Sequence, residues 1–335
     1  MTLPDLLRNE DYLLAEPAFR VLAWVDASFS DPRMGEAGAR CFEAFLKQAG
    51  AEVETLRITA KGHRSAKPSA EAVAKALDWA RTAEKRFPDA LFANGGKDNP
   101  FGTWSVPQFR ISQEPGMVAI DIAVRPDQEK AVALADRIVE ILRDLPVMGA
   151  VMGMGFHRPY GLDSLQNCMP LGFRRYRTAL EGDVGSVRDT FAPTKNPIFH
   201  RTFPDFQTGL PDIGWRTIVG TMFLDRIEGE PAHEDVVVEQ ASCGLIVTAG
   251  PDPIWGDVNA AEDISAFQAV SAWLKPLRIH RGYAYRAFGG ERDPVIRDRI
   301  DAYLDRLDPP DLEEAGAGGL FGMAPSFPSG TEEIR

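Results

Sequence analysis

The chain is short of cysteine, with only three in 335 residues. Cys41, Cys168 and Cys243 are an odd number and lie far apart, each beside apolar or small neighbours. A small secreted fold held by disulfides needs a dense and even set of cysteines. The pattern argues against a disulfide framework and predicts three buried free thiols in a reducing compartment.

Long apolar runs are also lacking. No apolar stretch approaches the roughly 18 to 20 residues that a membrane-spanning helix requires. Residues 1–11 carry acids where a signal peptide has a basic start followed by an apolar run. These features predict a cytoplasmic protein with no membrane partner.

Positive charge is scarce. Lys and Arg number 37 against 49 Asp and Glu, which gives a formal net charge of -12. Nucleic-acid binding depends on clustered Lys and Arg that neutralise phosphates, so the balance argues against a nucleic-acid partner. In the one basic aromatic cluster, Arg174-Arg175-Tyr176-Arg177, we expect local acids to pair with the arginines. The acidity suits solubility or attraction to a basic partner.

Motifs of catalysis and cofactor binding are missing as well. The chain has no Gly-x-Ser-x-Gly elbow and no phosphate loop, and the dinucleotide-like Gly153-Met-Gly155 has Arg158 where the third glycine belongs. His233-Glu234-Asp235 is the densest group of ligand-type side chains, but position 237 is Val, so the two-histidine helical signature fails. We therefore expect no cofactor and no metal. A metal-dependent hydrolase that uses His233, Glu234 and Asp235 is the alternative.

The most regular segment is 116–157. Apolar side chains alternate over 117–124, which predicts a strand with one buried face. Asp127 is placed to cap a helix whose apolar residues recur every three or four positions as far as Leu145, and a glycine-laced strand follows from Val147. A strand over 106–112 pairs with 117–124 as a hairpin, which breaks the strict alternation of strand and helix that a doubly wound parallel sheet needs.

The element order predicts an α+β fold with mixed or antiparallel sheets and helices packed on one face, and it leaves two similar α+β halves open. Further strands are expected at 19–25, 53–59, 216–224 and 244–250, and further helices from 32, 69, 259 and 293. We expect an N-terminal α+β half at 1–158, a proline-punctuated irregular crossover at 159–211 and a C-terminal α+β half at 212–308. Residues 309–335, rich in Gly, Ala, Glu, Ser and Pro, predict a disordered tail.

Acidic residues gather between Glu228 and Asp263, with Trp255 among them. Aromatic anchors ringed by charge are typical of protein interfaces. The pattern predicts a recognition surface formed by Asp252, Trp255, Asp257, Glu262 and Asp263. The alternative is a capped, solvated loop without a binding role.

Several segments resemble the type VI immunity family in their order along the chain. They are the strand 21–25 with the helix 41–46, the run 133–153, the strand 216–224, the segment 246–259 with its Gly256-Asp-Val-Asn259 turn, and the helix 267–277 that ends Trp-Leu-Lys-Pro-Leu. The resemblance covers about residues 18–308. It implies a protein that binds and neutralises a cognate toxin delivered by a type VI secretion system, encoded next to it, with no catalytic residue.

The resulting hypothesis is an immunity protein that inhibits its toxin by stoichiometric binding. The acidity is consistent with a basic, nuclease-type toxin. A non-catalytic structural adaptor, which docks a partner through 159–211, is a further alternative.

Overall fold

The computed structural model describes residues 7–9, 12–60, 65–95, 105–157, 174–182, 191, 208–279, 298 and 301–308. Most of the expected crossover at 159–211, much of the helix expected from 293, the expected tail at 309–335, and Cys168 lie outside the described residues. Within the described residues, no helix combines the length and the apolar character needed to span a bilayer.

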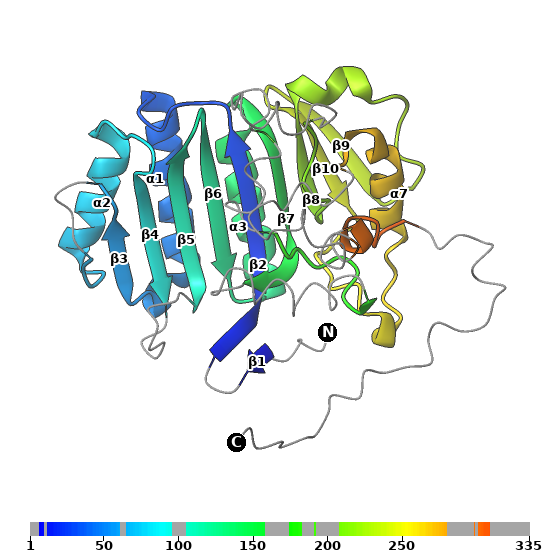
Figure 1. Ribbon diagram of the computed structural model, residues 1–335, viewed down its shortest axis with the longest axis horizontal. Helices are drawn as coiled ribbons and strands as arrows, with labels where there is room; N and C mark the ends of the chain where they lie inside the picture. The colour runs from blue at the N-terminus through cyan, green and yellow to red at the C-terminus, as the bar shows by residue number, and fades with distance from the viewer. Residues whose placement is uncertain are drawn as a thin grey trace, which may run out of the picture.

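One large antiparallel sheet organises the described part of the chain (Figure 1). Nine strands lie in the order β3-β4-β5-β6-β2-β7-β8-β10-β9, and β1 pairs beside β2 as a tenth. The strands are β1 (Leu7–Asn9), β2 (Tyr12–Val25), β3 (Thr55–Ile58), β4 (Ala90–Gly95), β5 (Ser105–Glu114), β6 (Met117–Val124), β7 (Val147–His157), β8 (Arg216–Gly220), β9 (Val236–Ala241) and β10 (Gly244–Ala249). The predicted α+β class with an antiparallel sheet is confirmed.

Four α-helices are described: α1 (Pro32–Ala49), α2 (Ala70–Thr82), α3 (Gln128–Leu142) and α7 (Ser265–Trp273). Short 3-10 turns are η1 (Gly50–Glu52), η4 (Thr221–Arg226), η5 (Val258–Ala260) and η6 (Lys275–Leu277). Figure 1 shows α1, α2 and α3 together behind the sheet, whereas α7 packs on β9 and β10 from the other face.

The sheet continues from the N-terminal part of the chain into the C-terminal part. β7 pairs with β8 in a register that sets Ala150 opposite Ile218. The ladder therefore passes without interruption between two parts of the chain that are separated in sequence by residues 158–215. This settles a point that the sequence left open, namely whether the two parts share one sheet.

A single row of side chains crosses all nine strands on the face that carries α1, α2 and α3. Opposite residues of an antiparallel ladder point to the same side. The row runs Leu56, Ala93, Phe109, Ile122, Val21, Met152, Arg216, Thr248, Val237. The first six are buried, and Val237 at the end is 61% exposed.

The helices cover the first part of this row because their apolar stripes match it. Asp127 caps α3 by accepting a hydrogen bond from the Lys130 N–H at 3.0 Å, as the sequence predicted. In α1, the rings of Phe42 and Phe45 lie 5.0 and 5.5 Å from the ring of Phe109 on β5. Aromatic contacts at such distances add packing energy beyond the area they bury.

Two of the three expected free thiols are confirmed, since Cys41 and Cys243 are buried and unpaired by a disulfide. Burial raises the pKa of the Cys41 thiol to about 12, and burial also raises the pKa of Cys243. Both shifts disfavour the thiolate, which is the reactive form of cysteine.

Candidate functional site

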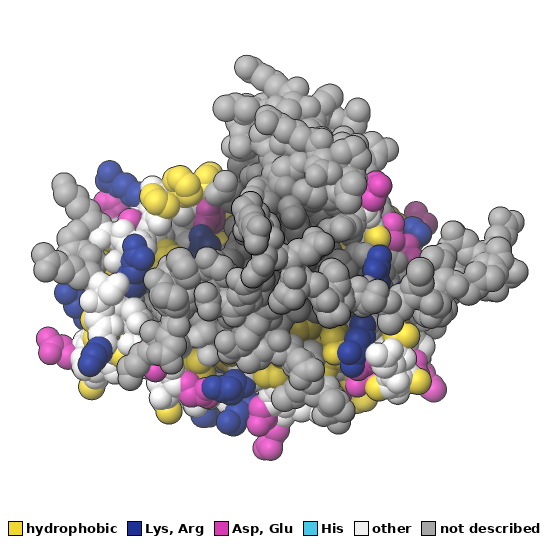
Figure 2. Space-filling model, turned by 60° about the horizontal axis from the view of Figure 1, so that its bottom comes forward, with side chains coloured by type: hydrophobic (Ala, Val, Ile, Leu, Met, Phe, Trp, Pro, Cys, Tyr) yellow, Lys and Arg dark blue, Asp and Glu magenta, His cyan; other side chains and the backbone are white. Residues whose placement is uncertain are grey.

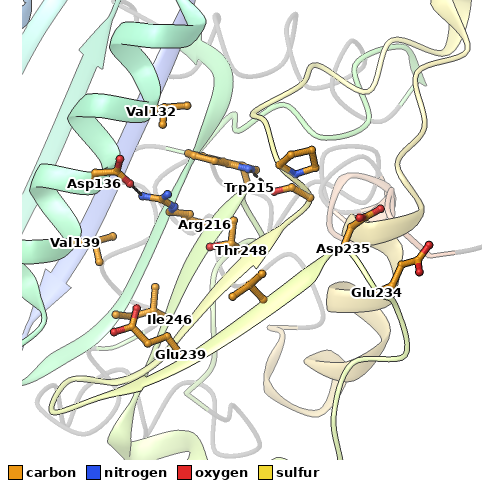
Figure 3. A pocket seen from close by; sticks show the side chains of 13 residues that line it. Val132, Asp136, Val139, Trp215, Arg216, Glu234, Asp235, Glu239, Ile246 and Thr248 are labelled. Carbon is orange, nitrogen blue, oxygen red and sulfur yellow. Dashed lines mark hydrogen bonds and ion pairs between the residues drawn. The ribbon is translucent and has the colours of Figure 1, made fainter.

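A cleft lies between the side of α3 and the strands β8, β10 and β9 (Figure 3). Its volume is about 560 Å³. The apolar lining comes from Val132, Val139, Trp215, Val237 and Ile246, and the acidic lining comes from Asp136, Glu234, Asp235 and Glu239. The cleft has one cationic wall residue, Arg216, so its character is an apolar floor with an acidic rim.

The strand register builds this floor. Thr248 of β10 lies between Arg216 of β8 and Val237 of β9, and Ile246 lies beside Glu239 in the neighbouring row. Period-two alternation sends all of these side chains to the α3 side of the sheet. The floor is thus the uncovered end of the same face that α1, α2 and α3 bury elsewhere.

The cations at the cleft are already engaged. Arg216 forms an ion pair with Asp136 of α3, and its guanidinium lies 4.5 Å from the centre of the Trp215 ring. Arg143, at the end of α3, pairs with Glu239. Glu234 and Asp235 are both exposed beside the cleft mouth. The surface that remains for a partner is therefore negative.

The charge bias extends well beyond the cleft. Residues 217–274 contain ten Asp and Glu but a single Lys or Arg, Arg226. Arg226 donates to the carbonyl oxygens of Thr208 and Pro276. Figure 2, which turns the lower end of the sheet forward, shows acidic and basic side chains side by side over the described surface. Of the ten acids in 217–274 only Glu239 lies in a strand, so the acidic bias of this region comes from the loops and 3-10 turns around the C-terminal strands.

Trp255 corrects the predicted recognition surface. Its side chain is completely buried, with ring centres 5.4 Å from Phe156 and 5.8 Å from Tyr176. An indole with no exposed area cannot serve as the aromatic anchor that the sequence suggested. Trp255 instead joins the 251–263 segment to the end of β7.

Asp257 and Glu262 form hydrogen bonds within the 251–263 segment. Asp257 is buried; its carboxylate accepts from the Asn259 N–H at 3.0 Å and from the Arg175 guanidinium at 3.2 and 3.3 Å. The carboxylate of the half-buried Glu262 accepts from the Asp257 N–H at 3.0 Å. These bonds satisfy backbone donors at the start of η5, which is the capped-loop alternative. The Arg175 pair also agrees with the expectation that local acids pair with that cluster.

Two of the predicted contact residues are on the surface. Asp252 is exposed. Asp263 is exposed as well, and it accepts from the Ser265 N–H at 2.9 Å in the lead-in to α7. Hydrogen bonds from Ser265 lower the pKa of the Asp263 carboxyl, so it stays ionised. Only these two of the five predicted residues keep an exposed charge that a partner could meet.

The triplet His233-Glu234-Asp235 precedes β9 and is held by local hydrogen bonds. The His233 Nε2 lies 2.9 Å from the Ser265 hydroxyl, and its Nδ1 accepts from the Asp235 N–H at 3.2 Å. Over the described ranges, no three His, Cys, Asp or Glu side chains come together in a group that could hold a metal ion. His63, His200 and His280 lie outside the described residues.

Sequence reasoning missed the cleft because it missed β9. The one signal was the β-branched run Val236-Val237-Val238, which is typical of a strand but shows no alternation.

Comparisons with known proteins show a likeness of fold and no match to a family. No family model matches the chain, and no curated protein matches it. Among solved structures, the Pseudomonas aeruginosa T6SS protein PA0821 is similar, with a TM-score of 0.70 and 16% sequence identity over 92% of this chain and 88% of that chain. At this identity the likeness shows a shared fold.

Proposed function

We propose that this chain is a cytoplasmic immunity protein that binds and neutralises a cognate type VI secretion toxin by stoichiometric inhibition, without catalysis and without a cofactor. The observation that carries the proposal is the fold shared with a T6SS protein over 92% of the chain. The order of segments along the sequence, which resembles the type VI immunity family, supports the same role.

The charge distribution supports a basic toxin as the partner. Residues 217–274 hold ten acids against one arginine, which is a formal charge of -9 beside the net charge of -12 for the whole chain. A potential of one sign raises association rates with an oppositely charged protein by roughly 10 to 10³-fold. It also disfavours partners of the wrong sign, which gives selectivity.

The cleft between α3 and β9 suits the side chains of such a partner. A lysine or arginine can lay its apolar stem on Val237 and Ile246 and keep its charged head at Glu234 or Asp235. Charge-assisted hydrogen bonds to carboxylates are about twice as strong as neutral ones. The exposed carboxylates of Asp252 and Asp263 extend the same acidic surface.

The test is co-expression of the full chain with the product of the adjacent open reading frame. We expect the neighbour alone to arrest growth, this protein to restore it, and the two to co-purify as a one-to-one complex. A neighbour that is harmless or unbound contradicts the proposal. A stable complex with a harmless neighbour would instead support the adaptor role.

Charge reversal at the cleft tests the surface. The double variant Glu234→Lys with Asp235→Lys should weaken the complex at least tenfold, because like charges across an interface repel. The matched control is Glu71→Lys with Asp78→Lys, which makes the same change in net charge on exposed positions of α2, at the other end of the sheet. We expect the control to bind within about threefold of the parent. Equal losses in both variants would show that only net charge matters.

A further inference from the structure

The outer edge of β9 offers backbone groups that nothing in the described structure pairs. Gly250 donates its N–H to the Asp235 carbonyl at 3.1 Å, and Ala249 lies opposite Val236. Bonded and non-bonded pairs alternate along an antiparallel ladder. It follows that Val238 and Gln240 direct their N–H and C=O groups away from β10.

This edge lacks most of the usual protection. Exposed edge strands are normally short, charged, interrupted by proline or bulged, because they template pairing with another chain. β9 has six residues, one charged residue (Glu239), no Lys or Pro, and no register shift against β10. Val237 is 61% exposed and Val238 is 38% exposed.

The opposite edge of the sheet shows the contrast. β3 has only four residues, and its Leu56 exchanges both backbone hydrogen bonds with Ala66 at 2.8 Å. Arg57 adds an exposed charge in the middle of the strand. β3 is therefore closed to a further strand at its centre, whereas β9 is open.

Charge decides which occupant fits β9. Glu234 and Asp235 precede the strand, Glu239 lies within it, and no Lys or Arg occurs from 227 to 274. A second copy paired through β9 would bring two acidic edges together, which is unfavourable. A basic segment would meet carboxylates of opposite sign.

We propose that β9 accepts an extended segment of the toxin, bearing lysine or arginine, as an eleventh strand of the sheet. The inference rests on the proposed function and specifies its binding mode. Main-chain hydrogen bonds to Val238 and Gln240 supply affinity, and alternate side chains of the added strand lie on the cleft side, beside Val237 and Glu239. The cleft then selects for positive charge at those alternate positions.

The direct test replaces one outward donor in the full-length protein. Val238→Pro removes the N–H that points away from β10, and proline is tolerated at such edge positions. The matched control, Val238→Thr, keeps the N–H and the β-branched shape. We expect at least tenfold weaker binding of the adjacent-gene product for Val238→Pro, binding within threefold for Val238→Thr, and unchanged circular dichroism for both.

A second measurement needs no variant. Amide hydrogen exchange of the parent protein should slow at Val238 and Gln240 when the toxin binds, because their N–H groups gain partners. Val237 and Glu239 already bond to β10 and should change far less.

The outcomes separate the two proposals. A complex that forms with the parent but is equally tight for Val238→Pro, with no new protection at Val238 and Gln240, overturns strand addition and leaves the immunity role standing. Absence of any complex with the neighbouring gene product overturns both. The free parent protein could instead be a dimer that the Val238→Pro substitution converts to a monomer. That result would mean that β9 pairs with a second copy of this chain, and it would overturn the proposal of a toxin strand.

Discussion

One face of the sheet is covered by helices in one region of the molecule and partly exposed in another. Over β3 to β7, the row from Leu56 to Met152 is buried beneath α1, α2 and α3. Over β8, β10 and β9, the row continues through Arg216 and Thr248 to the exposed Val237, and among the described helices α3 alone borders it. α7 covers these last strands from the other face.

The comparison separates stability from recognition. Each large apolar side chain removed from water stabilises a fold by roughly 1.5 to 3 kcal/mol, so the covered region supplies most of the folding energy from this face. β8, β10 and β9 are positioned by backbone pairing that continues from β7, and the described helices leave part of their α3-side face uncovered. That face can carry acidic side chains and a cleft because the fold does not depend on covering it.

The largest expected effect is a difference in stability between substitutions in the covered part of the row and at its exposed end. Phe109→Ala removes a fully buried ring from between Phe42 and Phe45 and should lower the free energy of unfolding by about 3 to 5 kcal/mol. Val237→Ala, in the same row, should change it by no more than about 0.5 kcal/mol. Denaturant unfolding of both variants measures the difference. Similar losses would show that the exposed end is as structural as the covered one.

A smaller effect is expected within the acidic segment itself. Asp257→Ala removes the cap on Asn259 and the ion pair to the partly exposed Arg175, and should cost about 1 to 2 kcal/mol of unfolding free energy. Asp252→Ala changes an exposed carboxylate and should cost less than about 0.5 kcal/mol. Thermal unfolding at fixed pH compares them. A destabilised Asp252→Ala protein would contradict the assignment of Asp252 to the free surface.

The smallest expected effect is a difference in how often α1 and the β9–β10 hairpin open locally. In a Cys168→Ser background, Cys41 reports on α1 and Cys243 on the turn between β9 and β10. Both thiols are buried with raised pKa values, so each reacts only when its surroundings open. We expect a thiol reagent to modify Cys243 on the order of tenfold faster, because an edge hairpin opens more easily than a covered helix. Mass spectrometry of timed samples gives both rates, and equal rates would mean that the two regions open as one unit.

The sequence predicted those elements whose signals are local. The cap at Asp127 and the apolar period behind it predicted α3, and the neighbouring strands at 106–112 and 117–124 predicted the β5–β6 hairpin. Gly116 has φ 74°, a conformation that glycine adopts at little cost. In these cases the deciding residues lie within one or two turns of chain.

The sequence failed where burial depends on distant partners. Trp255 is enclosed by Phe156 and Tyr176, which lie far away along the chain, and its acidic neighbours suggested a surface position. The helix expected from 69 ends at Thr82, so Phe87 lies beyond it and is 53% exposed, whereas Trp79 within α2 is buried against the core. β9 gave no alternation because neither of its faces is fully covered. Local signals were therefore insufficient to predict β9, the edge strand of the proposed binding surface.

The central position of β2 has a consequence for biosynthesis. β2 lies between β6 and β7, and its Val21 pairs with Ile122 on one side and with Met152 on the other. A ribosome that adds roughly 5 to 20 residues per second finishes this apolar strand about 5 to 20 s before either neighbour exists. β2, which lies in the middle of the sheet, is thus one of the first strands to be synthesised, but it pairs with its neighbours late. The newborn chain must keep it from aggregating during that interval, so translation speed and early chaperone contact will influence how much folded protein the cell obtains.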